Sequence, residues 1–198
     1  GSEMCIRDSM GVDPGLTRCG VGIVRGGVGT PLELLGVGVI RTPSDLDHGA
    51  RLLRIHDGLE EWFDAHHPDA MAVERVFAQH NRSTVAGTAQ AMGLTQMIGA
   101  RHGVAVGVHT PSEVKAAISG SGRADKAQVG LMVARVLHLE KPPTPADAAD
   151  ALALAITHIW RGGTQSRIEA AMAVHQHSPA RTWRQRPAPR TRQEHHLR

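Results

Sequence analysis

The segment 143–158, PTPADAADALALAITH, constrains the fold of this chain more than any other part of it. Its alanines, leucines and isoleucine form an apolar helix pattern, and a helix of this kind has to be largely buried against other elements. Asp147 and Asp150 nevertheless lie three residues apart near its start, and such residues share one face of a helix. Because two like charges repel each other there, the pattern indicates that something besides helix formation holds both carboxylates in place.

Helix capping is an alternative explanation for Asp147. Thr144, Pro145 and Asp147 fit a capping box with the threonine as N-cap, the proline at the first helical position and the aspartate at the third. Such a cap contributes ~1 kcal/mol, and Asp147 taken alone fits a cap and a ligand equally well. Asp150 lies beyond the reach of the cap, although the helix dipole still favours a negative charge there.

Composition bounds the possible functions. The chain has 198 residues, which is enough for one domain with terminal appendages. Residues 161–198 carry eight arginines and two glutamates, whereas residues 1–160 carry 14 basic and 17 acidic side chains, so the basic pI comes from the end of the chain. The two cysteines are too few for a disulfide framework or a zinc site. No apolar run reaches the ~18–20 residues of a membrane span, and we expect a cytoplasmic protein without membrane contact.

The elements before the apolar helix alternate between strands and helices. Short aliphatic runs broken by the Asp-Pro-Gly turn predict hairpins over residues 12–40, and two later strands end near Glu74 and His109. Helical spacing of apolar residues predicts the helices 48–65, 83–102, 111–118, 124–139 and 145–160. This order predicts an α/β fold with a mixed five-stranded central sheet and helices on both faces.

The chain divides into three parts. Residues 1–9, GSEMCIRDS, lack alternation and apolar density, and we predict a tag or non-native leader there. Residues 10–161 are the expected folded domain. Residues 162–198 contain many arginines and prolines and few aliphatic residues, which predicts a disordered tail.

Acidic residues end two of the predicted strands. Asp13 and Glu74 follow short apolar runs, and strand ends and helix starts converge on one edge of an open α/β sheet. Together with Asp147 and Asp150 they would repel one another unless they shared a cation, and their hard oxygen ligands suit Mg²⁺ or Mn²⁺. Two such ions about 3.5–4 Å apart support in-line phosphoryl displacement. Taken singly, Asp13 also fits a turn residue and Glu74 a solvated strand end.

Four motifs resemble the RuvC family of bacterial Holliday-junction resolvases. They are GVDPGLTRCG, AVERVF, HTPSEVKAAISGSGRADKAQV and PTPADAADALALAITH, in the order and nearly at the spacing of that family. The resemblance as a whole extends over about residues 10–160. The resemblance implies an RNase H-like fold, and a homodimer that nicks two symmetric strands of a four-way DNA junction. It also implies two Mg²⁺ ions per subunit, with Mn²⁺ as a possible substitute, and cooperation with the RuvA–RuvB branch-migration complex.

The resemblance also assigns roles to individual residues. The family's four metal-binding acids fall on Asp13, Glu74, Asp147 and Asp150. Catalytic lysines near the scissile phosphate fall on Lys115 and Lys126, for which an ordinary solvated helix charge is the alternative.

Other residues are candidates for DNA contacts. Phe77 matches an aromatic residue that stacks on unpaired bases, and a core phenylalanine is the alternative. Arg75, Arg82 and Arg123 are further candidates for phosphate contacts. His158, two turns after Asp150, is expected to be a packed or surface histidine rather than a metal ligand.

Two departures and three rival functions stay open at this point. The residues CIRDSM stand where the family has an apolar start to its first strand, so that strand is expected to be truncated or poorly paired. The arginine-rich tail is not part of the motifs.

The rival functions are an RNase H-like nuclease acting on RNA or RNA–DNA hybrids, a sugar-kinase-like or actin-like ATP binder, and a catalytically impaired junction-binding module. We expect the dimer interface on the helix at 83–102.

Overall fold

The computed structural model describes residues 6–76 and 82–176. Within these ranges, the elements are β1 (Arg7–Asp13), β2 (Arg18–Gly26), β3 (Glu33–Arg41), α1 (His48–His66), β4 (Ala70–Glu74), α2 (Arg82–His102), β5 (Val106–His109), α3 (Pro111–Ser119), α4 (Lys126–Val136) and α5 (Ala146–Gln176).

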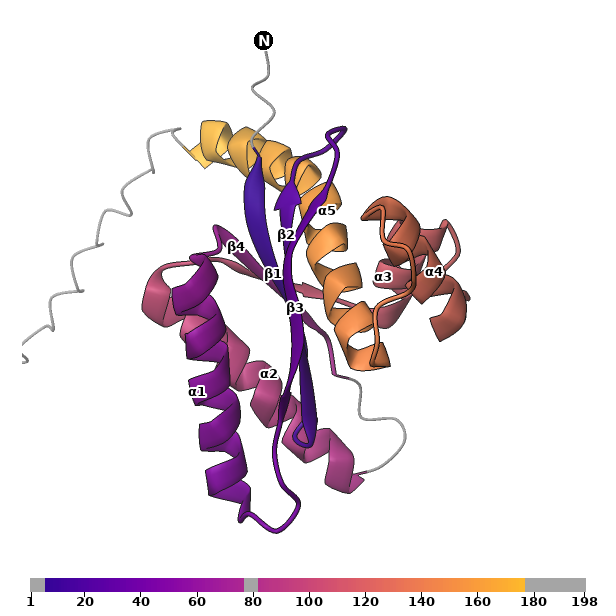
Figure 1. The fold of residues 1–198 in the computed structure, drawn as a ribbon. Coiled ribbons are helices and arrows are strands. Elements are labelled where there is room, and N and C mark those ends of the chain that lie inside the picture. Colours follow the sequence, from indigo (N-terminus) through magenta and orange to yellow (C-terminus); the bar gives the residue numbers. More distant parts are fainter. Residues whose placement is uncertain (1–5, 77–81, 177–198) are drawn as a thin grey trace, which may run out of the picture.

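The five strands form one mixed sheet in the order β3-β2-β1-β4-β5. The pairs β1–β2 and β2–β3 are antiparallel, whereas β1–β4 and β4–β5 are parallel. Helices α1 and α2 lie on one face of the sheet, and α3, α4 and α5 lie on the other (Figure 1). The predicted α/β architecture, with a five-stranded sheet covered on both faces, is therefore confirmed.

Strand β1 is complete, so the expectation of a truncated first strand was wrong. Each of its seven residues has a partner in β2, and Ser9–Val12 also pair with β4. Met10 and Val12 are fully buried, which supplies the apolar side chains that the strand needs despite the polar residues before them. Asp8 is held by Arg25, whose Nε lies 2.7 Å from the carboxylate. The first residues of β1 thus belong to the segment predicted as a leader, whose non-native origin stays a prediction.

Glycines bring α5 into direct contact with the central strands. A Cβ added to Gly11 would lie 2.0 Å from the carbonyl oxygen of Ala151, and one added to Gly20 would lie 2.1 Å from that of Asp147. Both glycines belong to the face of the sheet opposite to the side chains of Met10 and Val12, because neighbouring residues of a strand point to opposite faces. The missing side chains let the first turns of α5 lie directly on β1 and β2.

Helix α5 differs from its prediction at both ends. It begins at Ala146, so Pro145 precedes the helix and Asp147 is its second residue rather than the third residue of a capping box. It continues to Gln176 instead of ending near Trp160, so helix replaces the predicted disorder over the first part of the tail. Residues 177–198 lie outside the described residues. Within the described part of the chain, none of the helices combines the length and the apolar character needed to cross a membrane.

Candidate active site

The carboxylates predicted as a metal site are brought to one end of the sheet. Asp13 is the last residue of β1 and Glu74 the last of β4, and these neighbouring strands are parallel, with Val12 opposite Val73. Strand alternation puts both acids on the face that α5 covers, since Ala72 packs on that face and Val73 on the other. The start of α5 lies at the same end of the sheet (Figure 1). It carries Asp147 and Asp150, whose charges act on Asp13.

Electrostatic coupling shows how near the four carboxylates are to one another. Burial, followed by the negative charges of Asp150, Glu74 and Asp147, raises the pKa of Asp13 to about 8, although the positive charge of Lys126 opposes this shift. Burial and the charge of Asp150 also raise the pKa of Glu74. Asp13 and Glu74 therefore lie in a partly desolvated space that disfavours their ionised forms, and added positive charge there would favour ionisation.

Two cationic side chains already lie against these acids. Lys126 Nζ, at the start of α4, lies 2.7 Å from Asp150 Oδ2, and this hydrogen bond raises the pKa of Lys126. The guanidinium Nε of Arg18, the first residue of β2, lies 3.0 Å from Asp147 Oδ2. Asp147 is thus bound by a residue of the sheet and not by its own helix cap.

Arg18 was missed by the sequence analysis, although it lies in the GVDPGLTRCG motif. The signal that could have found it is the antiparallel pairing of β1 with β2. Asp13 is opposite Gly20, and Arg18 lies on the same face two residues away. A hairpin register therefore predicts that Arg18 reaches the carboxylates, but the register could not be fixed from the sequence alone.

The donor set fits a hard divalent cation. All four acids offer oxygen ligands, and their combined charge exceeds what Lys126 and Arg18 supply. Among the described residues, however, no three of the four place their ligand atoms within 4.8 Å of one another. Repulsion and the two ion pairs explain this spacing, because each pair draws one aspartate toward a cationic side chain.

The remaining predicted residues differ in how close they come to this site. The charge of Lys115, on α3, lowers the pKa of Glu74, which places it near the carboxylates. Arg123 is exposed in the loop before α4, and Arg75 is exposed directly after Glu74. Arg82 begins α2, and Phe77 lies outside the described residues.

His158 packs against a second histidine and not against the acids. Its Nδ1 lies 3.1 Å from Nε2 of His109, the last residue of β5. Burial, and then the neighbouring His109, lower the pKa of His158 to about 4, and burial also lowers the pKa of His109. The expected packed role of His158 is confirmed, with both imidazoles neutral near pH 7.

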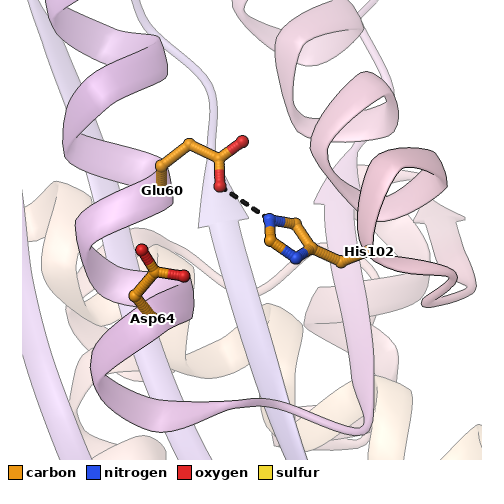
Figure 2. Close-up of side chains that lie close together, drawn as sticks. All are labelled: Glu60, Asp64 and His102. Atoms are coloured by element: carbon orange, nitrogen blue, oxygen red, sulfur yellow. Dashed lines mark hydrogen bonds and ion pairs between the residues drawn. The ribbon is translucent and has the colours of Figure 1, made fainter.

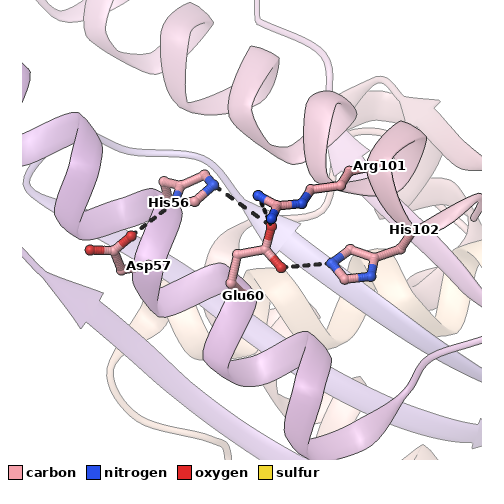
Figure 3. A network of polar contacts seen from close by, with 5 residues as sticks. All are labelled: His56, Asp57, Glu60, Arg101 and His102. Carbon is pink, nitrogen blue, oxygen red and sulfur yellow. Dashed lines mark hydrogen bonds and ion pairs between the residues drawn. The ribbon is translucent and has the colours of Figure 1, made fainter.

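A second group of possible metal ligands lies away from the sheet end, between α1 and α2. Glu60, Asp64 and His102 have ligand atoms within 4.8 Å of one another (Figure 2). His102 Nε2 lies 2.6 Å from Glu60 Oε2, and its ring stacks on Phe63. On the other side of Glu60, Arg101 lies 3.5 Å and His56 3.6 Å from Oε1 (Figure 3). Since an arginine and two histidines surround the glutamate, this network explains the attachment of α2 to α1 without a metal ion.

The family model described as crossover junction endodeoxyribonuclease RuvC matches residues 9–158, which include all four acids and both lysines. The chain belongs to the RuvC family. Among curated RuvC proteins, that of Cutibacterium acnes is 76% identical over 165 residues, covering 83% of this chain and 84% of the relative. The RuvC of Streptomyces avermitilis is 61% identical over 166 residues and is covered over 94% of its length.

Solved structures agree with this membership in the RuvC family. T. thermophilus RuvC in complex with a Holliday junction substrate superposes with a TM-score of 0.76 and 32% identity, covering 81% of this chain and 97% of that one. The yeast mitochondrial Holliday junction resolvase Ydc2 has a TM-score of 0.60 at 10% identity, which supports a shared fold only. The predicted RNase H-like nuclease fold is thereby confirmed.

Proposed function

We propose that this protein is a crossover junction endodeoxyribonuclease that resolves Holliday junctions in homologous recombination and DNA repair. The observation that carries the proposal is the position of the carboxylate cluster within the family match: Asp13, Glu74, Asp147 and Asp150 gather at one end of the RNase H-like sheet. Paired nicks in symmetric strands separate the four arms into two duplexes. Attack of water on phosphorus in line with the P–O3′ bond leaves 5′-phosphate and 3′-hydroxyl ends.

The four carboxylates would hold two Mg²⁺ ions in each subunit, with Mn²⁺ as a possible substitute. When bound, such ions supply an activated water and stabilise the leaving oxygen of a phosphodiester. Burial and the neighbouring negative charges raise the pKa of Asp13 to about 8, and this unfavourable environment for an unpaired carboxylate supports the assignment. At Asp147 and Asp150 the ions would compete with Arg18 and Lys126, which lie against one oxygen of each carboxylate.

Lys126 and Lys115 would then act on the substrate. Both lie close enough to the acids to affect the pKa of Glu74, so both can reach a phosphate positioned there. An ammonium group at that place neutralises the negative charge that develops on the phosphoryl oxygens. Phe77, Arg75, Arg82 and Arg123 remain the candidates for contacts with bases and phosphates around the cleaved strand.

A homodimer would provide the two active sites that a junction of two-fold symmetry requires. The outward face of α2 supports the predicted interface, because Met97 is 47% exposed and Gly93 has open space around it. The RuvA–RuvB complex is the proposed partner in branch migration, and the cytoplasm the proposed location.

Substitution of single carboxylates tests the proposal. Asp13→Asn and Asp150→Asn each remove a ligand charge while keeping the size of the side chain. Each variant should bind a four-way junction and fail to cleave it in Mg²⁺. Undiminished Mg²⁺-dependent nicking by both variants would overturn the assignment of the carboxylates.

A further inference from the structure

An open pocket of about 660 Å³ lies at the catalytic end of the sheet, beside the carboxylates. Its walls come from the start of β2, the end of β3, the loop that follows β3, and α1. The residues that line it are Thr17, Arg18, Arg41, Thr42, Pro43 and Arg54. None of the described residues that line this pocket is acidic, and we call the pocket the arginine groove.

Like charges face each other across the strands of the arginine groove. Arg18 of β2 and Arg41 of β3 are direct register partners, so their side chains leave the same face of the antiparallel pair. Like charges in directly opposite positions destabilise a sheet. The pair lies in a folded part whose net charge over residues 1–160 is negative, so the positive charge is concentrated locally, where it can attract an anionic ligand.

Hydrogen bonds to neutral groups orient the arginines around the groove. Arg51, next to the groove, donates from Nε to Thr42 Oγ1 at 2.9 Å and from a terminal nitrogen to Thr17 Oγ1 at 2.8 Å. Arg54 donates from Nε to the carbonyl oxygen of Arg41 at 2.8 Å. These contacts fix the guanidinium groups and leave their charge uncompensated.

Carboxylate partners are scarce here. Among the ion pairs formed by the described residues, Arg18 has one with Asp147, and Arg41, Arg51 and Arg54 have none. The groove therefore concentrates positive charge directly beside the negative charge of the active site.

Arg18 connects the two regions. It lines the groove and also lies 3.0 Å from Asp147, so the positive surface begins where the carboxylate cluster ends. A nucleic-acid strand with one phosphate at the carboxylates can place its adjacent phosphates along this surface. Guanidinium groups suit that ligand because their planar fork matches two phosphate oxygens.

We propose that the arginine groove binds the DNA backbone next to the cleaved phosphodiester, and that Arg18 joins this contact when a divalent cation replaces it at Asp147. The inference rests on the proposed function, because it assigns a path to the strand that the carboxylates cleave. It adds Arg41 and Arg54 as DNA-binding residues that none of the sequence motifs includes. Metal binding and backbone binding are then coupled through Arg18.

The salt dependence of junction binding tests this proposal. The double variant Arg41→Gln/Arg54→Gln is compared with the unaltered protein for binding of a four-way junction in Ca²⁺, at several salt concentrations. Each lost phosphate contact lowers the slope of log K against log salt by about 0.9. We therefore expect a slope smaller by about 2 and binding about tenfold weaker. The double variant Arg41→Lys/Arg54→Lys keeps the charges and should keep the slope.

A matched control has the same charge change elsewhere. Arg7 begins β1 at the opposite end of the sheet and Arg135 lies near the end of α4, and both are exposed. Arg7→Gln/Arg135→Gln should keep the original slope. The unaltered protein should bind a junction with neutral methylphosphonates next to the cleavage site more weakly than the unmodified junction. The affinity of the Arg41→Gln/Arg54→Gln variant should differ little between these two junctions.

The outcomes separate this inference from the proposed function. If the unaltered protein binds and cleaves junctions while the glutamine variant keeps its slope and affinity, the groove proposal is wrong and the function stands. Equal losses in the glutamine variant and the control would also contradict a specific groove. If the unaltered protein does not bind junctions at all, both proposals fail. Circular dichroism and thermal unfolding of each variant exclude a loss that comes from misfolding.

Discussion

Lys126 Nζ lies 2.7 Å from Asp150 Oδ2, and the guanidinium of Arg18 takes the equivalent place at Asp147. Protein cations thus occupy the carboxylates that divalent cations would use. This arrangement lowers the repulsion within the cluster in the metal-free protein. It also means that a metal ion bound at Asp147 or Asp150 competes with a protein cation for the carboxylate.

Removal of Arg18 should strengthen metal binding in the absence of DNA. In Arg18→Gln the carboxylate of Asp147 loses its competing partner, so we expect Mn²⁺ affinity to rise by roughly two- to fivefold, a typical effect for one partly exposed ion pair. Isothermal titration calorimetry measures it. Arg25→Gln breaks a similar arginine–aspartate pair at the other end of the sheet and should leave Mn²⁺ affinity unchanged. Weaker Mn²⁺ binding by Arg18→Gln would mean that the arginine supports the site instead.

The stability of the metal-free protein should fall as the pH rises toward 8. The pKa of Asp13 is about 8 in the folded protein and near 3.8 when unfolded, so the folded state binds the extra proton between these values. The contribution of Asp13 to the free energy of unfolding is fully present below pH 3.8 and is lost progressively as the pH rises to 8. Asp13→Asn abolishes that loss and should be more stable than the unaltered protein by the largest margin at pH 8, in EDTA.

Urea unfolding at pH 5 and pH 8 measures this margin. The control Asp45→Asn changes an exposed loop carboxylate and should show no such trend. A margin that shrinks from pH 5 to pH 8 would contradict the electrostatic picture of the cluster.

The histidine pair predicts the opposite pH trend on the acid side. His158 has a pKa of about 4 in the folded protein and near 6.5 when unfolded, so the unfolded state binds the extra proton in this window. Stability should therefore be lost as the pH falls from 6.5 to 4, by roughly 2–3 kcal/mol from this residue. In His158→Gln, which keeps a polar partner for His109, the loss should be smaller. The control is His48→Gln, an exposed position; equal acid sensitivity in all three proteins would rule out the pair as the cause.

Gly20 should not tolerate a side chain. Its added Cβ would lie 2.1 Å from the carbonyl oxygen of Asp147, a backbone atom that can move only if α5 moves. Gly20→Ala should lower the free energy of unfolding by about 1–3 kcal/mol and weaken Mn²⁺ binding, because Asp147 and Asp150 move with the helix. Gly162→Ala, on the same helix with open space around it, should change stability by less than about 1 kcal/mol. Normal stability and Mn²⁺ affinity in Gly20→Ala would show that the close approach of α5 is not required.

The positions of the acids could be predicted because each depends on a local rule. Asp13 and Glu74 end apolar strand runs, and Asp147 and Asp150 share a helix face, so the sheet topology alone brings them together. The resemblance of the motifs then narrowed the chemistry to junction cleavage. Neither step required knowledge of side-chain contacts.

The errors have a common physical origin in contacts between distant segments. The prediction that Asp147 belongs to a capping box was wrong because Arg18, on strand β2, is its partner. The first strand was expected to be weak because Arg7 and Asp8 are polar, yet pairing on both sides and the burial of Met10 and Val12 stabilise it. The arginine groove was missed for the same reason, since its members are spread over three elements.

Cleavage of a synthetic mobile four-way junction tests the central claim most directly. The protein is incubated with the junction in Mg²⁺, with the junction in EDTA, and with a linear duplex and an RNA–DNA hybrid of the same sequence in Mg²⁺. The account predicts paired nicks at symmetric positions in two strands of the junction, only in Mg²⁺, with ends that a ligase can rejoin. Cleavage of the hybrid or the duplex as fast as the junction, or nicking of the junction in EDTA, would contradict it.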